Sequence, residues 1–205
     1  MINLPPPIKT GEMSVEEAVS ERRSVRDFDS KSITTEELAT LCWAGQGITD
    51  SNRRYRAAPS AGATYPILLY VALGAESVPG FEAGLYLYVP REHALETIKT
   101  GDSRRALARA SLEQMWMSDA AVTFIIVADY QQITPRYGRR GIPYAHYEGG
   151  HVAENIMLEA VALGLGSCAV GAFDDNRVAK EAALGGDEVP LLLLPVGHIA
   201  RGKRG

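Results

Sequence analysis

The chain has 205 residues, of which 46% are hydrophobic, and a net charge of −4 at pH 7. This length and composition are typical of an ordered protein with one buried core. Acidic and basic residues are mixed along the chain, so it lacks the basic face that nucleic-acid binding requires. We expect an N-terminal arm over residues 1–13 and a single domain over residues 14–205.

The sequence carries no sign of a membrane segment, a disulfide framework or a metal site. No run of 18 apolar residues occurs, and the first residues, MINLPPPIKTGEM, lack the apolar core of a signal peptide. We therefore expect a cytoplasmic protein that does not bind membranes. Cys42 and Cys168 are expected to be buried thiols, and the four histidines show no metal-ligand spacing with them.

Two capping boxes and two apolar stretches organise the first half of the chain. Ser14 and Glu17 predict the start of one helix, and Thr34 and Glu37 predict the start of another, which the glycines of WAGQG end. Further along, we expect strands at 67–73 and 84–90 and one or two helices over 93–117.

The second half contains the most apolar segments. The stretch AAVTFIIVAD, residues 120–129, lacks alternation and therefore predicts a central strand that is buried on both faces. Residues 149–167 predict a long buried helix that ends at GLG, and a short helix near Asp174 and a last strand over 190–199 follow. Because strands and helices do not alternate strictly, we expect the α+β class.

The stretch RAAPSAGATYP, residues 56–66, sets small residues between two prolines just before the strand at 67–73. Small residues near proline and glycine commonly form a turn. The alternative is that the backbone comes close to a flat or bulky ligand, because small side chains leave its N–H groups accessible. Both explanations stay open.

The segment ERRSVRDF follows the first predicted helix and clusters basic residues around a hydroxyl: Arg22, Arg23, Ser24 and Arg26. Such a cluster can be a solvated charged face. It can also be a phosphate clamp, in which guanidinium groups hold a dianion and the serine adds a hydrogen bond. A clamp of this kind would require a phosphorylated cofactor.

The segment GLGSCAVGAFDD, residues 164–175, interrupts an apolar run with glycines and alanines. One explanation is close packing of a helix on a sheet. The other is that the backbone N–H near Gly171 reaches a ring atom that accepts a hydrogen bond, which a larger side chain would block.

Taken in this order, the three segments resemble the nitroreductase family of flavoproteins over about Ser14 to Gly197. The stretch from Arg136 to Asp175 is most similar to the SagB-type dehydrogenases, a group that includes the azoline oxidases. The resemblance implies a nitroreductase-like fold, with a central mixed or antiparallel sheet flanked by helices. It also implies an intertwined homodimer with FMN at the interface.

The resemblance further implies which residues bind FMN. The phosphate and ribityl group would contact Arg22, Arg23, Ser24 and Arg26. The ring would lie against Pro59, Ser60, Ala61 and Gly62 of the other subunit, and the backbone of Gly171 and Ala172 would face flavin N5. Arg201 or Lys203 would supply a distal phosphate contact.

The loop before the long helix departs from the azoline oxidases. Those enzymes resemble one another in a Lys-Tyr pair thought to remove a proton, where this chain has Arg136-Tyr137. An arginine stays protonated and cannot act as the base that a tuned lysine can be. Tyr137 could donate a hydrogen bond or a proton, or could simply pack in the loop.

The resemblance therefore predicts an FMN-dependent oxidoreductase that takes a hydride from NADH or NADPH and reduces a nitroaromatic, quinone-like or other small acceptor. Tyr137 and Gly171 are the candidate catalytic positions. The flavin would carry the chemistry, so no GxGxxG dinucleotide segment is needed. Two alternatives stay open: a SagB-type dehydrogenase or oxidase of a peptide-derived heterocycle, and a flavin-binding protein with little reductase activity.

Overall fold

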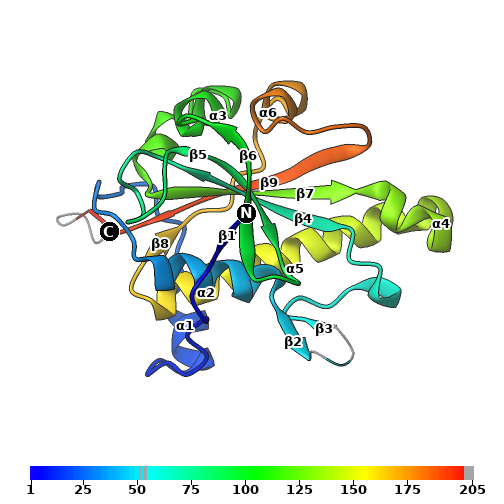
Figure 1. Cartoon of the computed structure of the whole chain (residues 1–205), viewed down its shortest axis with the longest axis horizontal. Helices are drawn as coiled ribbons and strands as arrows, with labels where there is room; N and C mark the ends of the chain where they lie inside the picture. The colour runs from blue at the N-terminus through cyan, green and yellow to red at the C-terminus, as the bar shows by residue number, and fades with distance from the viewer. Residues whose placement is uncertain (51, 53–54, 201–205) are drawn as a thin grey trace.

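The structure is a computed structural model that describes residues 1–50, 52 and 55–200. Its centre is an antiparallel sheet in the strand order β1-β6-β5-β4-β7-β9-β8 (Figure 1). The strands of this sheet are β1 (Ile2–Asn3), β4 (Ile67–Leu73), β5 (Gly84–Val89), β6 (Ala94–Thr100), β7 (Val122–Asp129), β8 (Gly166–Ser167) and β9 (Glu188–Gly197). A separate hairpin pairs β2 (Ile48–Asp50) with β3 (Tyr55–Arg56).

Helices cover both faces of the sheet, as the α+β prediction requires. They are α1 (Val15–Glu21), α2 (Thr35–Gln46), α3 (Arg104–Ala110), α4 (Thr134–Tyr137), α5 (Gly141–Ala162) and α6 (Asp175–Glu181). The helices α2 and α5 lie on one face, and α3 and α6 lie on the other (Figure 1). The predicted fold class and the flanking helices are therefore confirmed.

The strand β7 is central, as its uninterrupted apolar sequence predicts. It pairs with β4 on one side and β9 on the other. Phe124 and Ile126 pack in the core beneath α2 and α5, whereas Ile125 and Val127 pack beneath α3 and α6. The strand is therefore buried on both faces, which removes the need for polar residues at alternate positions.

Both predicted capping boxes are present. The Ser14 hydroxyl accepts a hydrogen bond from the Glu17 N–H, and the Glu17 carboxylate accepts one from the Ser14 N–H. Thr34 and Glu37 form the same reciprocal pair at the start of α2. Each box satisfies backbone donors that a helix start leaves unpaired, which explains why both starts were predictable.

Two predictions along the chain are wrong. The first part of residues 93–117 is the strand β6, because pairing with β5 and β1 outweighs the local helical pattern. The long helix α5 spans Gly141–Ala162, not 149–167. Its buried stripe extends back to Ala145, and the chain turns at Gly164, with φ +72°, before β8.

Residues at the start of the chain take part in the sheet. The strand β1 pairs with β6 at one edge, and Leu4 is buried. His93 Nε2 lies 2.8 Å from the carbonyl oxygen of Pro5. Within residues 1–50, 52 and 55–200, no helix is long and apolar enough to cross a membrane.

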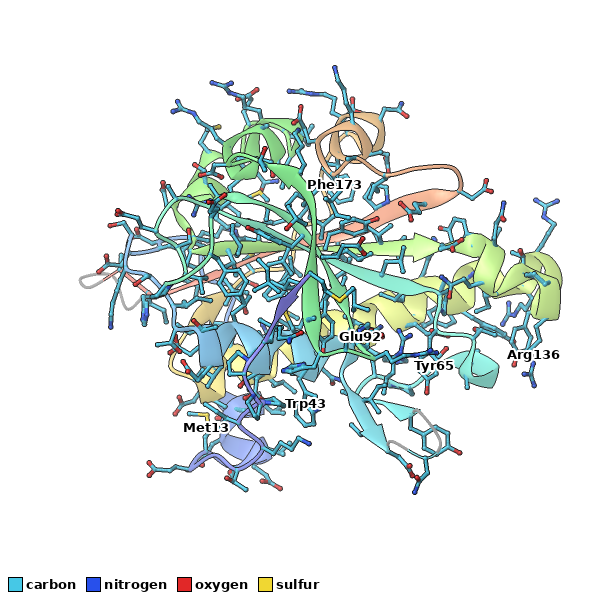
Figure 2. The ribbon with its side chains drawn as sticks, viewed as in Figure 1. Met13, Trp43, Tyr65, Glu92, Arg136 and Phe173 are labelled. Atoms are coloured by element: carbon cyan, nitrogen blue, oxygen red, sulfur yellow. The ribbon has the colours of Figure 1, made fainter. Side chains whose placement is uncertain are left out.

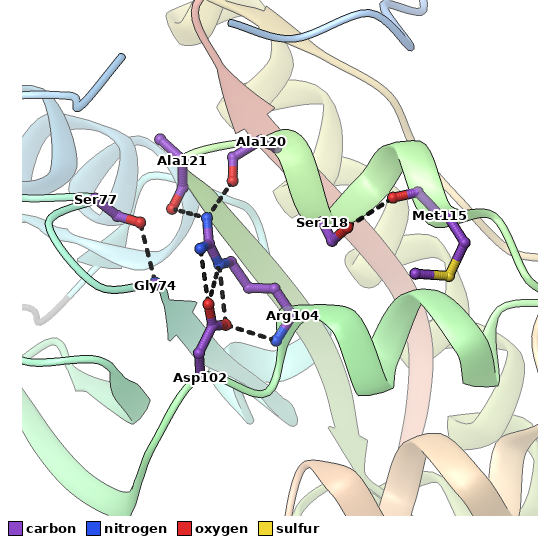
Figure 3. Close-up of polar contacts among 8 residues, drawn as sticks. All are labelled: Gly74, Ser77, Asp102, Arg104, Met115, Ser118, Ala120 and Ala121. Atoms are coloured by element: carbon purple, nitrogen blue, oxygen red, sulfur yellow. Dashed lines mark hydrogen bonds and ion pairs between the residues drawn. The ribbon is translucent and has the colours of Figure 1, made fainter. Parts of the chain in front are cut away.

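Arg104, the first residue of α3, ties this helix to the start of β7 (Figure 3). Its Nη1 donates to the carbonyl oxygens of Ala120 at 2.6 Å and Ala121 at 3.1 Å, and its Nη2 lies 2.8 Å from Asp102 Oδ2. Burial raises the pKa of Asp102, but the hydrogen bonds and charge of Arg104 outweigh it and hold that pKa below its usual value. The guanidinium group therefore donates hydrogen bonds to two backbone carbonyls and to one carboxylate.

Replacing Arg104 with methionine should lower the free energy of unfolding by about 2 to 3 kcal/mol, because the carbonyls and Asp102 lose a charged donor while the apolar stem is kept. Urea denaturation measures this change. The matched variant Arg105→Met, at an exposed position of α3, should shift stability by no more than about 0.5 kcal/mol. Equal effects of the two substitutions would contradict the assigned role.

Candidate functional site

The strand β9 has one edge that the chain covers only in part. The short strand β8 pairs with Val196 and Gly197, and Val170 forms a bridge to Leu193. In the described part of the chain, the preceding residues of β9 form a ladder only with β7. An open pocket of about 380 Å³ follows this edge, lined by Tyr130, His146, Gly150, Gly171, Phe173, Asp175, Val189, Pro190, Leu191 and Leu192.

Gly171 lies in this pocket with an open side. A Cβ atom placed there would meet only Leu192 Cδ2, at 3.6 Å, which is ordinary van der Waals contact. At Gly166, by contrast, a Cβ would lie 2.9 Å from side-chain atoms of Val25 and Ile199. Packing within the chain therefore explains the glycine at 166 but not the one at 171.

The backbone around Gly171 offers hydrogen-bond donors. Within the described residues, neither its N–H nor that of Ala172 donates to another group of the chain. The Ala172 carbonyl accepts a hydrogen bond from Gln114 Nε2 at 3.2 Å, which fixes the segment from the α3 side. Two adjacent exposed residues thus carry N–H groups that have no acceptor among the described residues.

The residues after α1 run beside β8. The Val25 N–H donates to the Ser167 carbonyl at 2.9 Å, and Ser24 and Ser167 form a parallel β-bridge. Ser24 is exposed, whereas the Ser167 hydroxyl is buried and has no hydrogen-bond partner among the described residues. Residues 24–26 and Gly171 therefore lie along the same edge of the sheet, the edge that β8 and β9 form.

The arginines of this segment do not converge on one point. Arg22 Nε lies 3.6 Å from Glu154 Oε1, and the Arg26 guanidinium carbon lies 5.8 Å from the centre of the Trp116 ring. Arg23 Nη1 donates to two carbonyl oxygens at the end of α1, both at 2.8 Å. Arg23 thus satisfies its own helix end, whereas Arg22 and Arg26 keep N–H donors that an anion could use.

The small residues of loop 59–63 are held by α5. The Ala61 N–H donates to Glu148 Oε1 at 2.8 Å. Burial raises the pKa of Glu148, although the Ala61 N–H, the Ser60 hydroxyl and His151 act in the opposite direction. Gly62 has φ +59°, a conformation that favours glycine.

Arg136 and Tyr137 close over the same loop. Arg136 Nη1 donates to the Gly62 carbonyl at 3.1 Å, and the Tyr137 ring packs edge-on against Tyr144, with centroids 5.4 Å apart. A Cβ at Gly62 would lie only 2.6 Å from the Tyr137 hydroxyl oxygen and 2.7 Å from Arg136 Cζ. Both side chains therefore lie against Gly62, in the loop 59–63.

The predicted site residues form two groups within one chain. Arg136 lies at one end of the molecule, and Met13, just before α1, lies toward the opposite side (Figure 2). Residues 24–26 and Gly171 lie along one edge of the sheet. The loop 59–63 is instead hydrogen-bonded to Arg136 of α4 and Glu148 of α5. Arg201 and Lys203 lie outside the described residues.

Sequence reasoning missed two polar features. Glu148 is only 5% exposed and lies on the buried stripe of α5 between Ala145 and Val152. A carboxylate at a core position of the helix could have identified this residue from the sequence, because such groups are rarely buried without a partner. The Tyr130 hydroxyl lies 2.6 Å from His146 Nε2 at the pocket. No pattern joins these two residues in the sequence, because only the fold brings them together.

A family model described as the nitroreductase family matches residues 19–198. The chain belongs to the nitroreductase family. A Methanocaldococcus jannaschii protein that carries the name of a nitroreductase is 42% identical over 187 residues, which are 91% of this chain and 92% of that protein. A Ralstonia eutropha crystal structure, also named as a nitroreductase, superposes with a TM-score of 0.86 at 29% identity and covers 98% of this chain and 90% of its own.

A protein and a complex that are named for microcin are also similar to this nitroreductase-family chain. The Escherichia coli microcin B17-processing protein McbC is 29% identical over 127 residues, which are 60% of this chain but 46% of McbC. A chain of the E. coli microcin synthetase complex shares the fold, with a TM-score of 0.74 at 22% identity. The match covers 94% of this chain and 75% of that chain. The predicted family and fold are confirmed.

Substitutions at the two glycines of this region separate packing from ligand contact. Gly166→Ala should lower the free energy of unfolding by about 1 to 3 kcal/mol, because its Cβ would overpack Val25 and Ile199. Gly171→Ala should change it by less than about 0.5 kcal/mol. Thermal or urea unfolding of the cofactor-free protein tests both, and a large loss at Gly171 would identify it as a packing glycine.

The stability contribution of Glu148 should depend on pH. Because its pKa is raised in the folded state, its contribution is present below the unfolded pKa and is lost as pH rises through the folded value. Wild type should therefore gain stability relative to Glu148→Gln when pH falls from about 7.5 to 5. Urea midpoints of both proteins at the two pH values measure this, and a constant difference would refute the assignment.

Proposed function

We propose that this protein is an FMN-dependent oxidoreductase that uses NADH or NADPH to reduce a small nitroaromatic or quinone-like acceptor. The observation that carries the proposal is the open Gly171 backbone beside the uncovered edge of β9. Two unused N–H groups and the absence of a side chain allow a flat ring to approach the backbone. These features fit the hydrogen-bond acceptors along the edge of a flavin ring.

The phosphate of FMN fits the other part of the same edge. Ser24 is exposed there, Arg22 and Arg26 retain donors, and the buried Ser167 hydroxyl has no partner among the described residues. We assign Arg26 and Ser24 to the phosphate and ribityl group, with Arg22 as a further charge. Arg23 contributes through its backbone position, because its guanidinium group is bound to the end of α1.

The distribution of the site residues supports a site built from two copies of the chain. Loop 59–63 has the small residues that a ring requires, yet its hydrogen bonds are to Glu148 and Arg136, and in the described part of the chain none joins it to residues 24–26. In a homodimer, the loop of one copy can cover the ring that lies on the other copy. We therefore propose that the functional unit is a dimer with two equivalent FMN sites.

The bound flavin would supply the hydride chemistry, accepting two electrons from the nicotinamide and passing them to the acceptor. The chain's own residues would bind, orient and exclude water. A Vibrio harveyi protein named as an NADPH:FMN oxidoreductase shares the fold, with a TM-score of 0.66 at 19% identity over 91% of this chain. That name supports the choice of cofactor and donor.

A dehydrogenase or oxidase of a peptide-derived heterocycle is the second candidate. It is favoured by the likeness to McbC and to the trifolitoxin-processing protein TfxB of Rhizobium leguminosarum, 35% identical over 114 residues. The chain spans less than half of either relative: 46% of McbC and 30% of TfxB. Arg136 argues against this candidate, because a guanidinium that donates to the Gly62 carbonyl cannot take up a proton.

Purified protein should be yellow, should release FMN on denaturation, and should bleach rapidly when NADH or NADPH is added without oxygen. Arg26→Ala should weaken FMN binding roughly tenfold to hundredfold, because a charge-assisted contact of about 1.5 to 3 kcal/mol is lost. Arg105→Ala, on α3 across the sheet, is the matched control and should retain FMN.

Three outcomes would count against this function. A colourless protein that takes up no FMN would overturn the cofactor assignment. A flavoprotein that NADH and NADPH do not bleach would favour the heterocycle dehydrogenase or a flavin carrier. Full FMN retention by Arg26→Ala on dilution would remove that residue from the phosphate site.

A further inference from the structure

A second open pocket, of about 390 Å³, lies where the start of the chain meets α2 and the turn between β5 and β6. Pro7 and Lys9 line it from the start of the chain, Trp43 from α2, and Pro90 and Arg91 from the turn. In the strand order of the sheet, β5 and β6 lie on the far side of β4 from β9 and β8. The lining includes none of the residues that the proposed function assigns to FMN.

His93 shapes this pocket without adding charge to it. Its Nε2 lies 2.8 Å from the Pro5 carbonyl oxygen, which can only accept a hydrogen bond, so Nε2 carries a proton. Its Nδ1 then accepts a hydrogen bond from the Tyr88 hydroxyl at 2.8 Å. Burial lowers the pKa of His93, although the hydrogen bond to Pro5 acts in the opposite direction, so the ring is neutral at pH 7. Both ring nitrogens are therefore engaged within the chain.

The apolar part of the pocket suits a planar ring. Trp43 of α2 (Figure 2) is half-buried, and its Nε1 donates to the Ile48 carbonyl at 3.4 Å, which fixes the orientation of the indole. Pro7, Ile48 and Pro90 add side chains that consist of carbon alone. Indole and aliphatic surfaces bind aromatic rings by stacking and burial, and the volume is enough for one or two fused rings.

The charged part of the pocket suits an anion. Lys9 Nζ lies 5.4 Å from the centre of the Trp43 ring, and Arg91 is exposed on the turn. Within residues 1–50, 52 and 55–200, neither cation forms an ion pair, and no acidic side chain lines the pocket. Two positive charges therefore stand without a counterion beside an aromatic wall, in a chain whose net charge is −4.

We propose that this pocket is a second ligand site, distinct from that of the flavin, and that it binds a planar aromatic carboxylate. Lys9 and Arg91 donate hydrogen bonds to the carboxylate, and the attached ring lies against Trp43. The ligand supplies the negative charge that the two cations lack and covers the exposed part of the indole. This inference goes beyond the proposed function and does not depend on it.

Isothermal titration calorimetry of 2-naphthoate into the purified protein, with its cofactor bound, tests the inference. Arg91→Gln and Lys9→Gln should each weaken binding about three- to tenfold, because each removes one charge-assisted hydrogen bond. Raising the salt concentration should weaken binding to the wild type, since both cations are exposed. Arg105→Gln, at an exposed position of α3 outside the pocket lining, is the matched control and should bind as wild type does.

A neutral ligand of the same shape separates charge from ring contact. The wild type should bind 2-naphthamide more weakly than 2-naphthoate, whereas the double variant Lys9→Gln/Arg91→Gln should bind the two with nearly equal affinity. Trp43→Leu should weaken both ligands, because the ring contact is lost. If Trp43→Leu does not fold, the exposed charge variants carry the test. The ligand should also raise the melting temperature of the wild type more than that of the double variant.

Three results would overturn the inference. The first is the absence of measurable 2-naphthoate binding at millimolar concentration. The second is a preference for the carboxylate that survives in the double variant. The third is release of FMN by 2-naphthoate, or loss of 2-naphthoate binding in Arg26→Ala, since either would place the ligand in the flavin site. Failure of the proposed function has a different signature: a colourless protein that binds 2-naphthoate through Arg91 would keep this site and lose the flavin assignment.

Discussion

The strand β8 has two residues and covers only the end of β9, which leaves the edge of β9 before Leu193 without a strand partner in the described part of the chain. A free strand edge normally presents backbone groups to solvent or to another chain. Here the bridge between Val170 and Leu193 holds the next segment against that edge, so Gly171 and Phe173 line a pocket. This side of the pocket is anchored in the sheet, because β9 also pairs with the buried strand β7.

The helix α5 connects the pocket to the rest of the proposed site. Its first turns carry His146 and Glu148, which contact Tyr130 and the 59–63 loop, and a later turn carries Glu154, which pairs with Arg22. One continuous helix therefore fixes the spacing between the loop and the basic segment. In a symmetric dimer both copies would have the same spacing between the loop and the basic segment. A site shared between the two chains could then have a fixed geometry.

The sequence predicted those parts of the fold that local physics decides. Capping boxes at Ser14 and Thr34 and the apolar run of β7 were sufficient, because each satisfies its own backbone or buries its own side chains. The strand β6 was missed because its pairing with β5 is a tertiary interaction. The start of α5 was missed because Gly149 looks like a helix boundary, whereas it packs closely against Leu191.

The site was predictable to a smaller extent. Local motifs identified the Arg22 segment, loop 59–63 and Gly171, and the structure then distinguishes roles within them. The Arg23 side chain bonds to the end of α1, the Arg136 side chain donates to the Gly62 carbonyl, and a Cβ at Gly171 would meet only Leu192, so packing does not require a glycine there. The pairing of Tyr130 with His146 could not be read from the sequence, since it depends on how the 3-10 helix after β7 meets α5.

The central claim is that each flavin site combines the basic segment of one chain with the 59–63 loop of another. Co-expression of two variants, Arg26→Ala and Gly62→Val, with different affinity tags tests it. On dilution, each variant alone should lose FMN, whereas the doubly purified mixed dimer should retain FMN in one of its two sites, because that site combines two unaltered segments. If no mixed dimer retains FMN, the two segments serve the same flavin within one chain, and the account is contradicted.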